Sequence, residues 1–196
     1  FTMLITGKNI TLENNNVKLR FPVREDIPHL KRVFADSEIW KYTVSKVQTD
    51  EEIEGFYQDA SAGLNDGSKF TFIIIDKASG RFAGTSSYGN ISEKDKRLEI
   101  GWSYLGKEFR GTGVNAHFKF LMLQYAFETL KMKRVEFKTD KLNSRARKAL
   151  LKIGCTEEGI LRSHTLMHDG RRRDTVFYSI LDSEWNKIKS NIFNGL

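Results

Sequence analysis

Arg110-Gly111-Thr112-Gly113-Val114-Asn115 links an apolar, strand-like run at residues 98–105 to a helix-like run at 116–130. Two glycines at such a junction allow successive backbone N–H groups to point into one small space. The N-terminus of the helix adds a partial positive charge at the same place. The stretch therefore predicts a site that holds a pyrophosphate.

The length and composition are those of one ordinary globular domain. The chain has 196 residues, of which 39% are hydrophobic and 12% aromatic, and its charged residues are spread rather than gathered in blocks. A chain of this size buries a sizeable core but is too short for two large ones. We expect a single domain over residues 1–196.

The chain has one cysteine and no long apolar segment. The only cysteine, Cys155, leaves no intrachain disulfide, and no apolar run reaches the roughly 18 residues that span a membrane. Residues 1–8 lack the apolar core of a secretion signal. We therefore expect a cytoplasmic protein without a membrane partner. Because His29, His164 and His168 are dispersed, we expect no metal.

The net charge of +7 favours an anionic partner, which could be a nucleic acid or a phosphorylated cofactor. Without a dense basic patch, the charge does not favour a nucleic acid. Arg171, Arg172 and Arg173 come nearest to a patch, and we interpret them as a solvated hairpin edge protected from aggregation by its charge. The sequence is compatible with a monomer or a homodimer.

The hydrophobic pattern predicts an α/β (α+β) fold with a mixed, mostly antiparallel sheet flanked by helices. A capping box at Thr49-Asp50-Glu51-Glu52 opens one helix, and Asp26 is the expected N-cap of an earlier one. Expected strands are 17–21, 70–75, 81–88, 98–105, 134–139, 160–167 and 175–181; expected helices are 27–35, one from residue 50, 116–130, 143–153 and 183–192. The three strands before the glycine loop form a meander.

The loop also fits a dinucleotide-binding fingerprint, Gly111-x-Gly113-x-x-Ala116, with Glu136 or Asp140 downstream to hold a ribose. Five residues, 106–110, separate the strand from the first glycine, and no second βαβαβ half follows. Both observations disfavour a nicotinamide-dependent oxidoreductase, which stays as an alternative. A kinase-type P-loop would need Gly-Lys-Ser/Thr at the end of the loop, and this chain has none there.

The arginine before the loop completes the pattern Arg/Gln-x-x-Gly-x-Gly/Ala, and here the chain resembles the GCN5-related N-acetyltransferase (GNAT) family. Residues 98–105 resemble its fourth strand, and residues 143–155 resemble its Asn-x-x-Ser-x-x-x-Leu-x-Lys-x-Gly-Phe helix. Residues 158–162, 169–171 and 178–185 resemble the C-terminus of Rim-type ribosomal-protein N-terminal acetyltransferases. Asn115 and Ala146 depart from the pattern, which has Gly or Ala at the first position and often serine at the second.

The resemblance implies an acyltransferase that moves an acetyl group from acetyl-coenzyme A to a primary amine by direct attack. The acceptor would be a protein N-terminus or a small-molecule amine. The resemblance implies these cofactor contacts: Arg110, Gly111, Thr112, Gly113, Val114 and Asn115 for the pyrophosphate, Ser103, Tyr104 and Leu105 on a splayed strand for pantetheine and the thioester, Asn143 for pantetheine amides, and Arg147 and Lys148 for adenosine phosphates. A non-catalytic module that binds coenzyme A or RNA is a second alternative.

Acetyl transfer needs a neutral amine, so a proton must leave the acceptor. Glu99 is the preferred acceptor of that proton; a water relay and a merely solvent-facing carboxylate are the other interpretations. Strand alternation would place Glu99, Gly101 and Ser103 on one face, with Leu98, Ile100 and Trp102 on the other.

Two further roles stay open. Ala146 lacks a hydroxyl that could protonate the departing thiolate, so that acid must be water or another residue. The acceptor pocket would be lined by aromatic residues and a histidine, unless these side chains belong to the core: Trp40, Tyr42, Tyr88 and His164.

Overall fold

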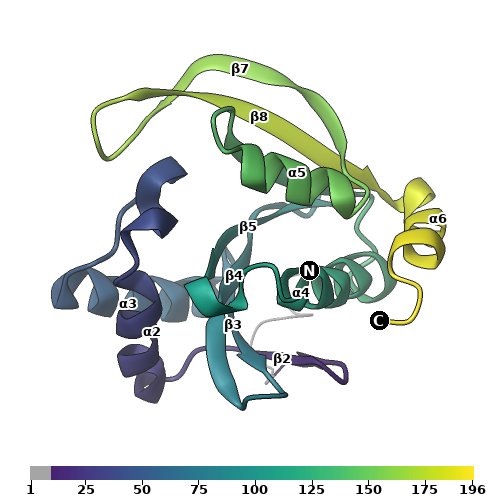
Figure 1. Cartoon of the computed structure of the whole chain (residues 1–196). Coiled ribbons are helices and arrows are strands. Elements are labelled where there is room, and N and C mark those ends of the chain that lie inside the picture. Colours follow the sequence, from purple (N-terminus) through teal and green to yellow (C-terminus); the bar gives the residue numbers. More distant parts are fainter. Residues whose placement is uncertain (1–9) are drawn as a thin grey trace.

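The computed structural model describes residues 10–196, so the stretch 1–8, in which no secretion signal is predicted, lies outside the described residues. One eight-stranded sheet has the order β1-β2-β3-β4-β5-β6-β8-β7. Neighbouring strands pair antiparallel except β5 and β6, which are parallel. Helices flank the sheet, with α2 and α3 to the left in Figure 1 and α5 beneath the β7–β8 hairpin. The predicted fold class is confirmed.

The elements follow the predicted order, with additional short pieces. The strands are β1 Thr11–Glu13, β2 Val17–Arg20, β3 Phe70–Asp76, β4 Arg81–Ser92, β5 Arg97–Leu105, β6 Arg134–Asp140, β7 Thr156–Leu166 and β8 Arg172–Leu181. The helices are α2 Ile27–Phe34, α3 Asp50–Asp66, α4 Val114–Gln124, α5 Ser144–Lys152 and α6 Asp182–Ile192. Three short 3-10 helices, η1 Arg24–Asp26, η2 Ser37–Tyr42 and η3 Lys107–Phe109, and a π-helical turn, η4 Tyr125–Thr129, complete the set. Within residues 10–196, no helix combines the length and apolarity that crossing a membrane requires.

Helix capping follows the sequence in one place and departs from it in another. The Thr49 hydroxyl accepts a hydrogen bond from the Glu52 N–H (3.2 Å), and the Glu52 carboxylate accepts one from the Thr49 N–H (2.9 Å), which confirms the capping box. Asp26 precedes α2 as predicted, but its carboxylate accepts from the Arg20 guanidinium (2.7 and 2.8 Å) and the Val23 N–H (2.8 Å). Its side chain therefore does not cap α2, because the strand arginine occupies it.

Two hydrophobic clusters hold the fold together. The first joins the inner strands to α4, α5 and α6 and contains Leu98, Ile100 and Phe137. The second lies between α2, η2, α3 and β5 and contains Trp40 and Tyr104. The strand β5 contributes to both clusters and so lies between the two layers of helices.

A β-bulge interrupts β5 in its second half. Ser87 of β4 pairs with Gly101, whereas Thr85 pairs with Tyr104, so β5 carries one residue more than β4 over this interval. Trp102 lies inside the interval with a φ of 49°, a value that non-glycine residues adopt rarely. An extra residue of this kind turns the side chains that follow it to the opposite face of the sheet.

The bulge corrects the predicted alternation. Leu98 and Ile100 belong to the first cluster, as expected for one face, but Trp102 packs against the second. The Ser103 hydroxyl accepts a hydrogen bond from Lys119 of α4, so Ser103 lies toward the α4 layer. Grouping Trp102 with Leu98 and Ile100 was wrong, because a one-residue bulge leaves no mark in a hydrophobic pattern.

Candidate functional site

The glycine loop has the backbone conformation that the sequence predicts. Gly111 and Gly113 have φ values of 81° and 94°, in the left-handed region where a side chain is strained. A Cβ built at either glycine meets no heavy atom within 4 Å. The backbone conformation, and not crowding by the protein, therefore requires glycine here, and the space in front of the loop is open.

The loop offers a row of free backbone donors. Within the described chain, none of the five N–H groups at residues 111–115 donates a hydrogen bond, while Ala116 and His117 both donate to the Gly113 carbonyl (2.8 and 3.2 Å). The helix α4 begins at Val114, two residues earlier than predicted, so the last of these donors belong to its first turn. Consecutive free N–H groups at a helix N-terminus form an anion site.

Arg110 is held by the protein on two sides. Its Nε donates to the Leu105 carbonyl (3.0 Å), and its Nη2 donates to the carboxylate of Asp36, the N-cap residue of η2 (2.7 Å). The guanidinium thus fixes the loop against the end of β5, and the charge it can add at the loop is shared with Asp36.

The strands β5 and β6 separate close to the loop. Their parallel pairing runs only from Arg97 with Arg134 to Glu99 with Glu136. Beyond Glu99 the rest of β5, including Ser103, Tyr104 and Leu105, pairs with β4 alone. The two strands therefore diverge at Glu99, and we call the space between them the splay.

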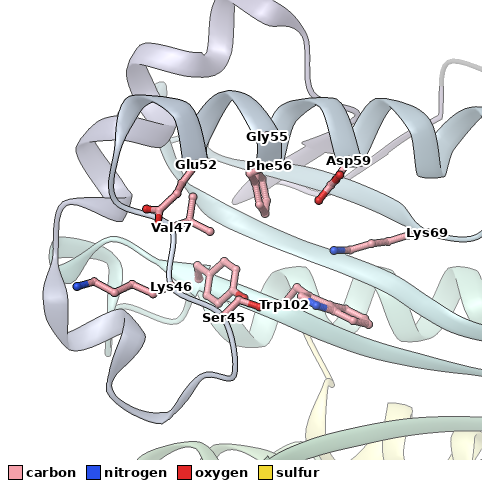
Figure 2. Close-up of a pocket in the computed structure, with 10 residues that line it drawn as sticks. Ser45, Lys46, Val47, Glu52, Gly55, Phe56, Asp59, Lys69 and Trp102 are labelled. Atoms are coloured by element: carbon pink, nitrogen blue, oxygen red, sulfur yellow. The ribbon is translucent and has the colours of Figure 1, made fainter. Parts of the chain in front are cut away.

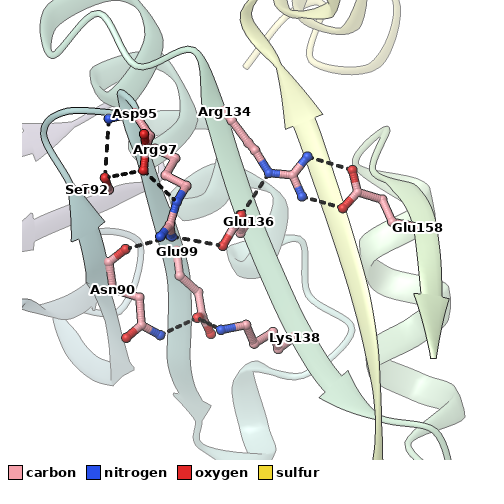
Figure 3. Close-up of polar contacts among 9 residues, drawn as sticks. All are labelled: Asn90, Ser92, Asp95, Arg97, Glu99, Arg134, Glu136, Lys138 and Glu158. Atoms are coloured by element: carbon pink, nitrogen blue, oxygen red, sulfur yellow. Dashed lines mark hydrogen bonds and ion pairs between the residues drawn. The ribbon is translucent and has the colours of Figure 1, made fainter. Parts of the chain in front are cut away.

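Glu99 lies at the closed end of the splay. Its side chain is buried, with the residue 6% exposed. Its Oε2 accepts a hydrogen bond from Asn90 Nδ2 (2.7 Å) and lies 2.8 Å from Nζ of Lys138, as Figure 3 shows. Neighbouring strands thus fix one oxygen of the carboxylate.

The other oxygen of Glu99 is free. In the part of the chain that the structure describes, Oε1 accepts no hydrogen bond, and no buried side-chain polar atom lacks a partner. It follows that Oε1 keeps contact with solvent. A Cβ on Gly101 would lie 3.2 Å from this oxygen, so the missing side chain leaves it uncovered. A carboxylate with one fixed and one free oxygen is suited to accept a proton.

Three residues of the α5 region differ in their availability to a ligand. The Asn143 side chain caps α5 by accepting a backbone N–H (3.0 Å). Arg147 donates to the Tyr178 hydroxyl (3.1 Å) and forms an ion pair with Glu157 (3.2 Å). Lys148 is exposed. Their predicted contacts with pantetheine and adenosine phosphates stay predictions.

A cavity of about 260 Å³ opens between α3, the segment before it and β5 (Figure 2). Nζ of Lys69 lies 4.4 Å from the centroid of the Trp102 ring, a cation–π distance. Burial lowers the pKa of Lys69, while the nearby Asp59 acts in the opposite direction. The residues that line the cavity are Ser45, Lys46, Val47, Glu52, Gly55, Phe56, Asp59, Lys69, Trp102 and Tyr104.

Trp102 connects this cavity to Glu99. Gly89 of β4 pairs with Glu99, and a Cβ on Gly89 would lie 2.6 Å from the Trp102 ring. The ring therefore lies directly over Gly89, beside the carboxylate. The cavity and the proposed base are neighbours on one side of β5.

Two predicted pocket residues are in the core instead, which corrects that part of the expectation. Trp40 is 1% exposed, and its Nε1 donates to the Phe34 carbonyl (2.9 Å). Tyr88 is 0% exposed, and its hydroxyl donates to the Met122 carbonyl (2.6 Å). Aromatic rings with a satisfied polar atom and no exposed surface pack the core, so neither lines the cavity.

The other two predicted pocket residues reach the surface. Tyr42 is half-buried at the end of η2, with Lys41 over its ring at 5.7 Å. His164 is exposed on β7, and its Nδ1 lies 3.1 Å from the Thr175 hydroxyl. Neither lines the cavity, and their contact with an acceptor stays a prediction.

The arginine run is not the solvated edge that we expected. Only Arg172 is exposed. Arg173 is 9% exposed and donates from Nε to the Thr175 hydroxyl (2.9 Å), while Arg171 pairs with the buried Asp140 (2.5 Å). The correction has a topological cause: at this hairpin the edge strand is β7, and the arginines precede or begin β8, which lies inside the sheet.

Sequence reasoning missed two lysines beside the splay. Lys138 holds Glu99, and Lys119 of α4 is 5% exposed with its Nζ 2.9 Å from the Ser103 hydroxyl. A signal for Lys119 was present, because it interrupts the apolar run Phe118-Lys119-Phe120-Leu121. Over residues 10–196, no group of three or more metal-ligating side chains is placed to hold a metal ion.

Comparisons with known proteins agree with this arrangement. A family model described as an acetyltransferase (GNAT) domain matches residues 16–156. The chain is 28% identical over 176 residues to the uncharacterized N-acetyltransferase p20 of Bacillus licheniformis, across 89% of this chain and 98% of that protein. It is 34% identical over 110 residues to YdaF of Bacillus subtilis (strain 168), whose name proposes a ribosomal N-acetyltransferase, across 56% of this chain and 59% of that one.

The fold agrees as well. The crystal structure of a GCN5-related N-acetyltransferase from Brucella melitensis superposes with a TM-score of 0.86 at 28% identity, covering 94% of this chain and 84% of that one. The glycine loop, the splay and the strand order thus occur together with a family match over most of the sequence. The chain belongs to the GNAT family of N-acetyltransferases.

Proposed function

We propose that the protein transfers the acetyl group of acetyl-coenzyme A to a primary amine by direct attack. The observation that carries the proposal is the row of five free N–H groups at residues 111–115, next to the splay between β5 and β6. When bound, acetyl-coenzyme A supplies an acetyl group activated as a thioester.

The donor side is proposed to use backbone atoms for most of its contacts. The N–H groups of residues 111–115 hold the pyrophosphate, with the charge of Arg110 behind them. The backbone of Ser103, Tyr104 and Leu105 faces the splay and binds pantetheine and the thioester oxygen. Asn143 and the cations Arg147 and Lys148 complete the site.

Glu99 is proposed to accept the proton that the acceptor amine loses. Its Oε1 is free, whereas Oε2 is fixed by Asn90 and Lys138. A positioned base of this kind contributes about 10² to 10⁴ in rate. The backbone donors of β5 stabilise the negative charge that develops on the thioester oxygen.

The acceptor is proposed to enter through the cavity beside Trp102. Lys69 and Trp102 line the cavity. The ring of Trp102 lies over Gly89, the residue of β4 that pairs with Glu99. A protein N-terminus or a small-molecule amine fits such an opening, and the name given to YdaF favours the protein N-terminus. Cytoplasmic location, a single domain, a monomer or homodimer, and the absence of a nucleic-acid partner stay predictions.

Calorimetry with coenzyme A tests the donor side. The wild-type protein should bind coenzyme A and not NAD. Gly113→Trp should weaken that binding about 10³-fold, because losing two charge-assisted hydrogen bonds removes about 4 kcal/mol. Gly170→Trp is the matched control, since Gly170 also has a positive φ (83°) and open space at its Cβ, and it should bind normally.

Thiol release with a panel of amines tests the transfer. Release that depends on the amine supports the proposal. Coenzyme A binding without thiol release would make the chain a non-catalytic binding module, and NAD binding in place of coenzyme A would favour the oxidoreductase alternative. Equal affinity of Gly113→Trp and wild type for coenzyme A would remove the loop from the donor site.

A further inference from the structure

Lys119 is a buried cation without a carboxylate beside it. Its residue is 5% exposed on α4, and its one hydrogen bond within residues 10–196 is to the Ser103 hydroxyl (2.9 Å). No ion pair reaches its Nζ from the described chain; the nearest aromatic ring on β6, that of Phe137, has its centroid 5.3 Å away. Burying a lysine without a counterion is costly, which makes such a residue a candidate for a functional position.

The position of Lys119 relates it to the splay. Ser103 is on β5 and Phe137 is on β6, beyond the point at which the two strands stop pairing. Nζ thus lies between residues of the two diverging strands, on the α4 side of the sheet. The Ser103 hydroxyl in turn lies 2.8 Å from the Ser86 hydroxyl of β4. The Lys119 ammonium, the Ser103 hydroxyl of β5 and the Ser86 hydroxyl of β4 are therefore hydrogen-bonded in a row.

Two ionisable groups on different elements act on Lys119. Glu99 acts on it from β5, and Cys155 acts on it from the segment after α5. Lys138 neutralises Glu99, while Glu184 of α6 acts on Cys155. Burial lowers the pKa of Lys119 to about 7 and raises the pKa of Cys155 to about 12. Near neutral pH the Lys119 amine is therefore present in both its protonated and its neutral form, while the Cys155 thiol stays protonated.

We propose that Lys119 is the acid that protonates the sulfur leaving the thioester. The assignment rests on the proposed function and fills the role left open by Ala146. Glu99 accepts the proton of the acceptor nitrogen, which forms the new bond to the acetyl carbon. Nζ of Lys119 gives a proton to sulfur as the carbon–sulfur bond breaks. Lys119 then regains a proton from solvent through the hydroxyl of Ser103, which is exposed.

The titration of Lys119 is measurable in the free protein. NMR of lysine labelled at Cε and Nζ should show one side chain with a pKa near 7. This signal should be missing in Lys119→Met and present in the control Lys133→Met, because Lys133 is an exposed partner of Asp182. A wild-type spectrum in which every lysine titrates near 10 would overturn the assignment.

Turnover separates an acid from a structural lysine. Lys119→Arg keeps a cation and hydrogen-bond donors, but a guanidinium does not give up its proton. Both Lys119→Arg and Lys119→Met should lower kcat about 100-fold and keep coenzyme A affinity within about 3-fold. The fall in wild-type kcat above pH 7 should be absent from both variants.

The outcomes are distinguishable from those of the proposed function. Wild-type kcat in Lys119→Arg, or a fall above pH 7 that persists in both variants, overturns the role of Lys119 while the transfer reaction stands. Absence of coenzyme A binding by the wild type overturns the proposed function first. If Lys119→Met fails to fold, the arginine variant and the wild-type titration still decide the question.

Discussion

The glycine loop and the cavity beside Trp102 are built from different atoms. The loop presents backbone N–H groups of five consecutive residues, so its chemistry depends on conformation. The cavity presents side chains from three segments between Ser45 and Tyr104, so its chemistry depends on how distant parts of the chain pack. The donor site can therefore stay the same while substitutions in the cavity change the acceptor.

This contrast predicts that variants on the acceptor side leave coenzyme A affinity unchanged. Glu99→Gln should have the largest effect, about a 100-fold loss of kcat at pH 7, because the acceptor proton then has no positioned base. The loss should shrink as the pH approaches the pKa of the amine, which sheds its proton unaided there. Turnover across pH and calorimetry with coenzyme A measure the two quantities.

Two controls accompany Glu99→Gln. Glu136→Gln removes the neighbouring carboxylate of β6, which pairs with Arg134 (2.8 Å), and should retain turnover. The double variant Glu99→Gln/Lys138→Met also removes the ammonium left without its partner, and it should lose the same rate as the single variant. Wild-type kcat over the whole pH range in Glu99→Gln would remove Glu99 from the mechanism.

Trp102→Ala should have an intermediate effect. It removes a wall of the cavity and the cation–π partner of Lys69, so KM for the acceptor should rise about 10-fold, equivalent to about 1.4 kcal/mol. Trp102→Phe retains an aromatic face and should lose less. If Trp102→Ala also bound coenzyme A more weakly, the glycine loop and the cavity would not be independent sites.

The smallest effect concerns stability and pH. Lys119 has a pKa of about 7 in the folded protein and near 10.5 when unfolded, so between these values the unfolded chain binds more protons and stability increases with pH. Between pH 7 and 8.5, the free energy of unfolding should rise by about 1.5 kcal/mol, as measured by urea denaturation. We limit the measurement to pH values below the ordinary pKa of a thiol. Above it the unfolded chain loses the Cys155 proton that the folded protein keeps, so Cys155 makes stability fall as the pH rises.

Lys119→Met is the comparison for this measurement. The variant should lack the pH-dependent rise and be more stable than the wild type at pH 7. A slope that is the same in both proteins would show that Lys119 does not titrate in this range, and would contradict its proposed role as the acid.

The sequence was informative where one residue type decides a local conformation. Gly111 and Gly113 permit the positive φ values that the loop adopts, and Thr49 and Glu52 form a capping box, so both features could be predicted from their own short stretches. Trp40 could not be placed in the same way, because an aromatic ring suits a core and a pocket equally well. Only the packing of η2 against α2 and β5 decides that it is buried.

The candidate site was harder to predict beyond the loop. The position of Glu99 could be predicted, but its partner Lys138 lies on a strand that follows β5 only after a crossover of 28 residues, 106–133. The placement of Trp102 depends on a bulge in a non-glycine stretch, for which no residue type gives a signal. Tertiary pairing, and not local propensity, determines both contacts.

The extra residue in β5 has an evolutionary consequence. With an even register, Trp102 would lie on the α4 side of the sheet, and the wall of the cavity proposed to admit the amine would have to come from elsewhere. Losing one codon between Gly101 and Tyr104 would leave three residues opposite residues 85–87 of β4, so it would remove the bulge and take the tryptophan out of the cavity wall. Point substitutions in the cavity would change its lining residue by residue, whereas a change in the length of this short interval would remove the bulge and move a whole wall at once.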